Sequence, residues 1–126
     1  MNWEIRITNE AKKDYRKFNS SIRKQILAGI YKVSAAPLPR PDGYGKPLVN
    51  KGGNNLTGFF KIKYRDIGIR VVYTLDIENH LMNIVVISER NDNQCYEMAV
   101  KMYEKYGKEI FRDISSISGA FLTEKI

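Results

Sequence analysis

The alternation of apolar and polar residues predicts one strand at the start of the chain and three more in its middle. Residues 3–7 (WEIRI) alternate as a half-buried strand does. Three further strand-like runs cover residues 56–65, 69–76 and 81–88, and only short turn-like breaks separate them. We therefore predict two consecutive hairpins, which together form an antiparallel meander.

Apolar residues at helical spacing predict two short helices between the first strand and the meander. Thr8 can cap the first helix, which carries Ala11, Tyr15 and Phe18 on one side. The sequence NSS then starts a second helix, whose apolar stripe consists of Ile22, Ile26, Ile30 and Val33. The tight turn between the two helices predicts an antiparallel pair.

Proline ends the second helix, because it lacks the amide hydrogen and clashes with the preceding turn. The stretch from Pro37 to Asn55 is rich in turn formers and has no periodicity, so we expect a long, mobile loop. After the meander, a last helix is expected from about Asn93 through Tyr106, with Gly107 ending or bending it. Residues 107–126 have only weak helical character and no predicted place in the fold.

The element order β-α-α-β-β-β-α predicts an α+β fold, in which the N-terminal strand and helical hairpin pack on a small antiparallel sheet. The helical pair would cover one face of that sheet and leave the other face free. In the strand FKIKYR, the apolar Phe60, Ile62 and Tyr64 would then point to the helices. The cations Lys61, Lys63 and Arg65 would line the free face.

Length and cysteine content indicate one domain in a reducing compartment. At 126 residues the chain can bury a core of its own. Cys95 is the only cysteine, so an internal disulfide is excluded. No apolar run has the length of a signal peptide core or a membrane span, and we expect a cytoplasmic protein with no membrane association.

The net charge of +7 is unevenly distributed along the chain. Residues 1–40 carry nine Lys and Arg against three Asp and Glu, and most of these cations fall on the predicted helical pair. Such a field favours nucleic acid, an acidic protein, or both in turn. A charge that only keeps the protein in solution is the simpler alternative.

Residue composition excludes several kinds of chemistry. The chain has no Cys/His spacing for a metal and no phosphate-binding glycine loop, and a single histidine leaves no Ser-His-Asp set. We interpret His80 as a solvated turn residue and Cys95 as a small packing residue. What remains is a set of cations with one tyrosine, which converge on the free sheet face and its rim: Lys61, Lys63, Arg70, Arg90 and Tyr96. Alternating lysines on an exposed strand can also serve only to prevent aggregation.

Two stretches carry a resemblance to a known family. GFFKIKYRDIGIRVVY, followed by VVISERNDNQCYEMAVKM, resembles the RelE family of bacterial toxins within the RelE/ParE superfamily. These proteins typically have a basic strand, an arginine before an apolar VY, and a late arginine followed six residues on by tyrosine. The similarity covers about residues 3–103, so we assign residues 1–106 to a RelE-like toxin domain and residues 107–126 to an extension of unknown role.

The resemblance implies the toxin of a type II toxin-antitoxin system. It implies a ribosome-dependent endoribonuclease that cuts mRNA in the ribosomal A site, uses no metal or cofactor, and leaves a 2′,3′-cyclic phosphate. Carried over by residue, the family's active site falls on Lys61, Lys63, Arg70, Arg90 and Tyr96. The basic family position at Arg65 implies an RNA contact.

The implied partners are a cognate antitoxin, mRNA and the ribosome. Docking on rRNA would use the cations of the helical pair, which are Lys12, Lys13, Arg16, Lys17, Arg23 and Lys24. The alternative is that these cations only form a solvated helix surface. Asp92 departs from the family, which often has a basic residue two positions after the late arginine.

Physical chemistry is consistent with the implied roles. Cleavage through the RNA 2′-hydroxyl needs a proton acceptor, stabilisation of the phosphorane charge and support for the departing 5′-oxygen. Clustered cations favour the phenolate of Tyr96 as base, with a lysine as the alternative; Arg70 and the lysines can stabilise the phosphorane. Arg90 would support the leaving oxygen.

Two other functions remain open from the sequence. A ParE-like inhibitor of DNA gyrase would share the fold without cleaving RNA, and a basic RNA-binding module could be catalytically silent. The cationic set with Tyr96 separates these possibilities, because a gyrase inhibitor has no chemical need for it.

Overall fold

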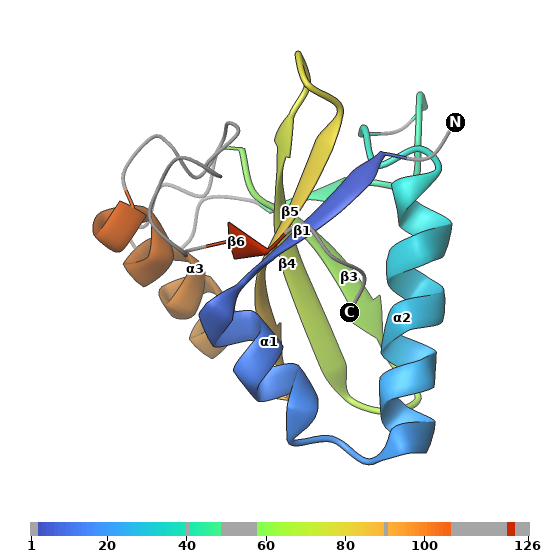
Figure 1. Cartoon of the computed structure of the whole chain (residues 1–126), viewed down its shortest axis with the longest axis vertical. Helices are drawn as coiled ribbons and strands as arrows, with labels where there is room; N and C mark the ends of the chain where they lie inside the picture. The colour runs from blue at the N-terminus through green and yellow to red at the C-terminus, as the bar shows by residue number, and fades with distance from the viewer. Residues whose placement is uncertain (1–2, 40, 49–57, 90, 107–120, 123–126) are drawn as a thin grey trace.

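The computed structural model describes residues 3–39, 41–48, 58–89, 91–106 and 121–122. In chain order its elements are β1 (Glu4–Thr8), α1 (Asn9–Arg16), α2 (Ser20–Ser34), β2 (Lys46–Pro47), β3 (Phe60–Tyr64), β4 (Ile69–Asp76), β5 (Leu81–Ser88), α3 (Asp92–Tyr106) and β6 (Phe121–Leu122). The strands form one sheet in the order β2-β3-β4-β5-β1-β6 (Figure 1). The predicted α+β class is confirmed.

Polar caps at two turns define the helical hairpin. The Thr8 hydroxyl oxygen accepts a hydrogen bond from the Ala11 amide at 3.0 Å, and the Asn19 side-chain oxygen accepts one from the Ile22 amide at 2.9 Å. Each cap satisfies an amide that the first helical turn leaves without a partner. Helices α1 and α2 therefore begin where the sequence predicts, and they lie as an antiparallel pair (Figure 1).

The first strand lies parallel to the last strand of the meander. Glu4 is opposite Leu81 and Ile7 is opposite Ile84, so the sheet is mixed rather than wholly antiparallel. Beyond Ile84, where β1 no longer pairs with β5, α1 packs beside β5. The Glu10 carboxylate of α1 also accepts a hydrogen bond from Lys105 of α3 at 2.8 Å. Helices that cover a strand edge prevent it from pairing with another chain.

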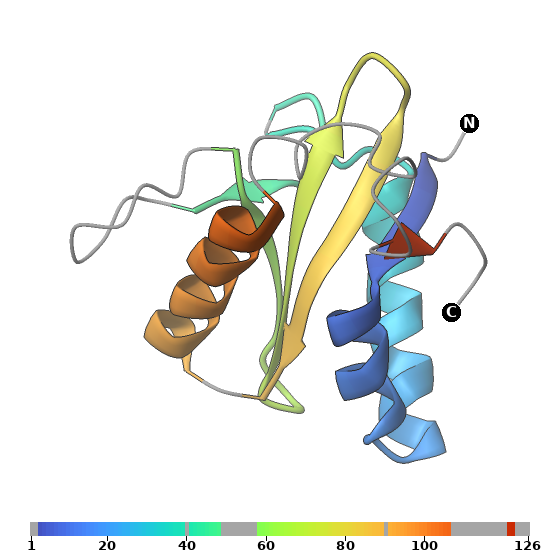
Figure 2. The same cartoon turned by 60° about the vertical axis from the view of Figure 1, so that its left-hand side comes forward.

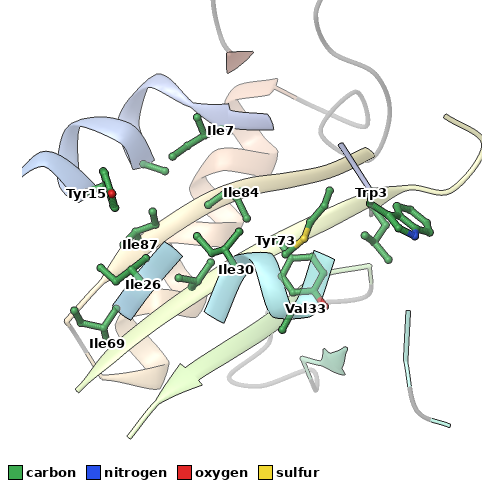
Figure 3. Close-up of a cluster of buried hydrophobic side chains, with 14 residues drawn as sticks. Trp3, Ile7, Tyr15, Ile26, Ile30, Val33, Ile69, Tyr73, Ile84 and Ile87 are labelled. Carbon is green, nitrogen blue, oxygen red and sulfur yellow. The ribbon is translucent and has the colours of Figure 1, made fainter. Parts of the chain in front are cut away.

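One apolar core fills the space between the helical hairpin and the sheet. Ile26 and Ile30 of α2 meet Tyr73 and Ile84 of the sheet, and all four side chains have no solvent exposure (Figure 3). Phe60, Ile62 and Tyr64 pack against this core from β3, as predicted. Successive side chains of β3 therefore point alternately to this core and to the other face of the sheet.

Tyr64 approaches α2 unusually closely. Its hydroxyl donates a hydrogen bond to the Ile26 carbonyl oxygen at 2.6 Å. Gly29 permits this approach, because a Cβ at that position would lie 2.5 Å from the Tyr64 Cε2. Burial raises the pKa of Tyr64, and it also raises the pKa of Tyr73, whose hydroxyl donates to the Pro37 carbonyl oxygen at 2.9 Å.

The prediction that the second sheet face is free was wrong. Helix α3 covers it and forms a second core (Figure 2): Leu48, Phe59, Val72, Val85, Val86, Cys95, Tyr96, Ala99 and Met102. Every residue of β5 is buried, and in β4 only Arg70 is partly exposed. Strands with such continuous apolar runs require a cover on both faces.

The stretch after α2 contains structure that the sequence did not predict. Tyr44 donates its amide hydrogen to the Ala36 carbonyl oxygen at 2.7 Å, and Gly45 donates to Leu38 at 2.9 Å. The chain then forms β2, which pairs antiparallel with β3 at the outer edge of the sheet. The rest of the predicted loop, residues 49–55, and the first two residues of the strand predicted from position 56 lie outside the described residues.

The second and third strands of the meander match their predicted bounds, whereas β3 is shorter than predicted. It ends at Tyr64, so Arg65 lies in the turn before β4. Helix α3 ends at Tyr106 as predicted, and Gly107 lies outside the described residues. From the extension, Phe121 and Leu122 form β6 and pair antiparallel with β1. Among the helices described, none is long and apolar enough to cross a membrane.

Candidate active site

The register of β3 and β4 brings three of the predicted site residues to one face of the sheet. Lys63 lies opposite Arg70, and Lys61 lies opposite Val72. Directly opposite residues project to the same face. Val72 belongs to the core under α3, so Lys61, Lys63 and Arg70 all project to the α3 side.

The fourth predicted residue, Tyr96, comes from α3. This helix starts after Asn91, whose side-chain oxygen accepts a hydrogen bond from the Gln94 amide at 2.9 Å. Cys95, Tyr96 and Ala99 of this helix pack against the sheet in the second core, where Tyr96 is 5% exposed.

Lys61 and Tyr96 meet directly. The Lys61 ammonium donates a hydrogen bond to the Tyr96 hydroxyl oxygen, with Nζ and Oη 3.2 Å apart. The ammonium lies 5.9 Å from the centre of the tyrosine ring, so it contacts the hydroxyl end rather than the ring face. This contact joins β3 to α3 at the margin of the second core.

Exposure differs across the cationic set. Lys61 and Arg70 are half-buried, Lys63 is exposed, and Arg65 is exposed in the turn beyond β3. The site is therefore a margin between the β3–β4 hairpin and α3, not the open sheet face that the sequence predicts. Lys63 and Arg70 place two positive charges at directly opposite positions on this face.

Arg90, the fifth predicted residue, lies outside the described residues, and its place in the site stays a prediction. The register does place Ser88, near the end of β5, opposite Arg70. The last described residue before position 90 is Glu89, which is exposed.

A pocket of about 320 Å³ adjoins the same end of β5. Lys17 and Phe18, beyond the end of α1, Ser88 of β5 and Met98 of α3 are among its lining residues. Lys17 also pairs with Asp14 at 3.4 Å. Sequence patterns do not predict this pocket, because its walls come from three segments far apart along the chain.

The cations of the helical pair lie mainly on the other side of the sheet. Helix α1 packs Ala11 and Tyr15 into the first core, and α1 and α3 lie on opposite sides (Figure 2). Lys13, Arg16 and Lys17 are exposed. Lys12 is half-buried. These residues form a basic surface separate from the contact between Lys61 and Tyr96, and Lys17 alone of them lines the pocket at β5.

Sequence analysis missed one cation at the site. Lys46 of β2 lies opposite Lys61 across the outer edge of the sheet. A two-residue strand gives no alternation of its own, so no pattern could have placed it. The only signal was a lysine before proline, and proline is typical of an edge strand.

The two other polar residues that the sequence analysis considered, His80 and Cys95, pack against neighbouring side chains. His80 is exposed in the β4–β5 turn and stacks on Trp3 with ring centres 4.7 Å apart. Cys95 is fully buried in the second core. In the part of the chain that the structure describes, no group of three or more His, Cys, Asp or Glu side chains is arranged to hold a metal ion.

Comparisons with known proteins identify the fold. No protein-family model matches the sequence, and a search of curated proteins finds no significant match. A solved structure of a mutant of the E. coli toxin RelE in the free state matches with a TM-score of 0.64 and 24% identity, over 81% of this chain and 98% of that chain.

Two toxin-antitoxin complexes also match. A RelBE complex from Mycobacterium tuberculosis gives a TM-score of 0.57 at 25% identity, over 73% of this chain and 95% of that chain. The intact E. coli RelBE complex gives a TM-score of 0.55 at 21% identity, over 71% of this chain and 98% of that chain. The chain has a RelE-like toxin fold, as the resemblance implies.

Proposed function

We propose that this protein is the toxin of a type II toxin-antitoxin pair and acts as a ribosome-dependent endoribonuclease on mRNA. The observation that carries the proposal is the hydrogen bond from Lys61 to Tyr96, set beside Lys63 and Arg70 on the same face. The RelE-like fold supports it, and so does the projection of Lys61, Lys63 and Arg70 to one face of the sheet.

The reaction begins with the RNA 2′-hydroxyl. Its oxygen attacks the adjacent phosphorus, and its proton passes to a base. The phenolate form of Tyr96 can accept this proton, and the Lys61 ammonium that donates a hydrogen bond to its oxygen stabilises the oxyanion. We assign the base to the pair of Tyr96 and Lys61. Since Tyr96 is 5% exposed and Lys61 is half-buried, we place the RNA on the Lys61 side of the pair.

The pentacoordinate phosphorane carries additional negative charge. Arg70 can hold two of its oxygens through the guanidinium fork, and Lys63 adds a compact charge beside it. The bond to the 5′-oxygen then breaks, that oxygen takes up a proton from water, and the products are a 2′,3′-cyclic phosphate and a 5′-hydroxyl. Arg90 supports the leaving oxygen by family resemblance. None of these steps requires a metal ion.

Two partners follow from the proposal. The basic surface of α1 gives Lys13 and Arg16 access to rRNA phosphates, which suits docking on the ribosome in the cytoplasm. An antitoxin would cover the cationic margin with an acidic or amphipathic segment.

The test is cleavage of mRNA on translating ribosomes. The protein is induced in bacteria, mRNA ends are mapped, and the wild type is compared with Tyr96→Phe and Arg90→Ala, alongside a gyrase supercoiling assay. Codon-phased cuts that disappear in both variants support the proposal. Intact mRNA with inhibited supercoiling would replace it with a gyrase inhibitor, and intact mRNA with unaffected gyrase would leave an RNA-binding module.

A further inference from the structure

The edge strand β2 is short but firmly held. Lys46 lies opposite Lys61, and Pro47 lies opposite Phe60. The Leu48 amide continues the pairing by donating to the Phe59 carbonyl oxygen at 2.9 Å. On the other side, the Gly45 amide is bonded to Leu38. Hydrogen bonds therefore fix the backbone on both sides of Lys46.

Two neighbours establish which face Lys46 occupies. Lys61, directly opposite, projects to the α3 side, where it meets Tyr96. Leu48, two residues after Lys46, is buried in the core under α3. Residues two apart in a strand share a face, so both observations place Lys46 on the same face as the candidate active site. Lys46 itself is exposed.

The face thus carries two successive rows of paired cations. Lys46 with Lys61 forms one row, and Lys63 with Arg70 forms the next, two residues along β3. The rows are about 6.6 Å apart along the strand, and neighbouring strands are about 4.8 Å apart. One row of lysines would suffice to protect an edge. Two successive rows of cations on one face match the regular spacing of phosphates along an RNA backbone.

We propose that Lys46 contacts an RNA backbone phosphate next to the scissile one. The inference rests on the proposed function and adds a subsite to it: Lys63, Arg70 and the Lys61–Tyr96 pair hold the reacting phosphate, and Lys46 extends the contact across the outer edge of the sheet. The exposed position of Lys46 suits a residue that binds substrate without taking part in proton transfer.

The experiment measures the salt dependence of RNA binding by the full chain. The probe is a labelled single-stranded RNA methylated at every 2′-oxygen, which cannot be cleaved. Lys46→Gln removes one charge and nearly preserves side-chain length. Because one phosphate contact to single-stranded RNA contributes about 0.7 to the slope of log affinity against log salt concentration, we expect the slope to fall by about 0.7.

Lys32→Gln is the matched control, because Lys32 is exposed on α2, which covers the opposite face, and has no proposed role in RNA binding. Its slope should equal that of the wild type. An unchanged slope in Lys46→Gln, an equal fall in Lys32→Gln, or no measurable binding by the wild type would each overturn the inference. Thermal unfolding of both variants is the check on folding. If their midpoints equal that of the wild type, a change in slope comes from charge and not from loss of structure.

A second measurement separates this inference from the proposed function. On programmed ribosomes, a contact made equally to substrate and transition state raises KM and leaves kcat unchanged, and we expect Lys46→Gln to raise KM about threefold to tenfold. If ribosomes carry uncut mRNA while the binding slope still falls, the enzymatic proposal fails and the phosphate contact stands. If cleavage occurs and the slope is unchanged, the phosphate contact fails alone.

Discussion

The ammonium of Lys61 and the hydroxyl of Tyr96 are 3.2 Å apart, and their hydrogen bond joins an outer strand of the sheet to the helix that covers it. The tyrosine ring packs in the second core while its oxygen faces the lysine. Because the ring holds the oxygen in place, the packing of α3 and the chemistry of the site depend on the same residue.

Replacing Tyr96 with phenylalanine should separate these two roles. The ring and its packing remain, so the thermal midpoint should change little, whereas loss of the proton-accepting oxygen should slow cleavage by about 10²- to 10⁴-fold. Single-turnover cleavage on programmed ribosomes and thermal unfolding measure the two effects. Wild-type cleavage by this variant would exclude Tyr96 as the base.

Arg70→Lys should lower activity although it preserves the charge. A lysine cannot make the two parallel hydrogen bonds that a guanidinium makes to a phosphate. We expect cleavage to fall about 10- to 100-fold, as for the loss of one hydrogen bond between charged groups. Arg16→Lys is the control, because docking on rRNA phosphates would use only the charge at this exposed position on α1, and it should keep wild-type cleavage. An equal loss in both variants would mean that Arg70 has no special role.

Gly29→Ala should destabilise the protein, against the usual trend. In a helix interior this change normally stabilises by about 1 kcal/mol. Here the added Cβ would lie 2.5 Å from the Tyr64 ring, and overpacking of this kind costs about 1 to 3 kcal/mol. Urea unfolding measures the difference. In a Tyr64→Leu background the same change should cost less, and an unchanged cost there would disprove the clash as its cause.

Stability should fall in alkaline solution because of Tyr64 and Tyr73. Burial raises the pKa of both above the ordinary value of about 10, so above about pH 10 the unfolded chain loses these protons before the native protein does. Their contribution is complete below about pH 10 and declines as the pH rises further. Thermal midpoints measured from about pH 8 to about pH 11 should fall less steeply for Tyr73→Phe than for the wild type. Parallel curves would contradict this expectation.

Local periodicity was sufficient to predict most of the elements. Strands β4 and β5 have their predicted bounds, because each is a long apolar run between clear turns. The caps at Thr8 and Asn19 start helices where expected. The parallel pairing of β1 with β5 could not be predicted, because it joins segments far apart and leaves no local pattern.

The candidate site was predictable in part. The two-residue period of β3 and the short turn to β4 place Lys61, Lys63 and Arg70 on one face, as the register confirms. An apolar stripe on α3 did not reveal which surface it would cover, so the site was expected on an open face. Arg65 was misplaced because β3 ends at Tyr64.

The pairing of β1 with β5 also determines how late in translation the sheet can be completed. Thr8 donates a hydrogen bond to the Val85 carbonyl oxygen, 77 positions later. At about 5 to 20 residues per second, Thr8 is synthesised about 4 to 15 seconds before Val85. Tyr96 emerges later still. A nascent chain therefore has neither its completed sheet nor its Lys61–Tyr96 contact until translation of the domain is nearly finished.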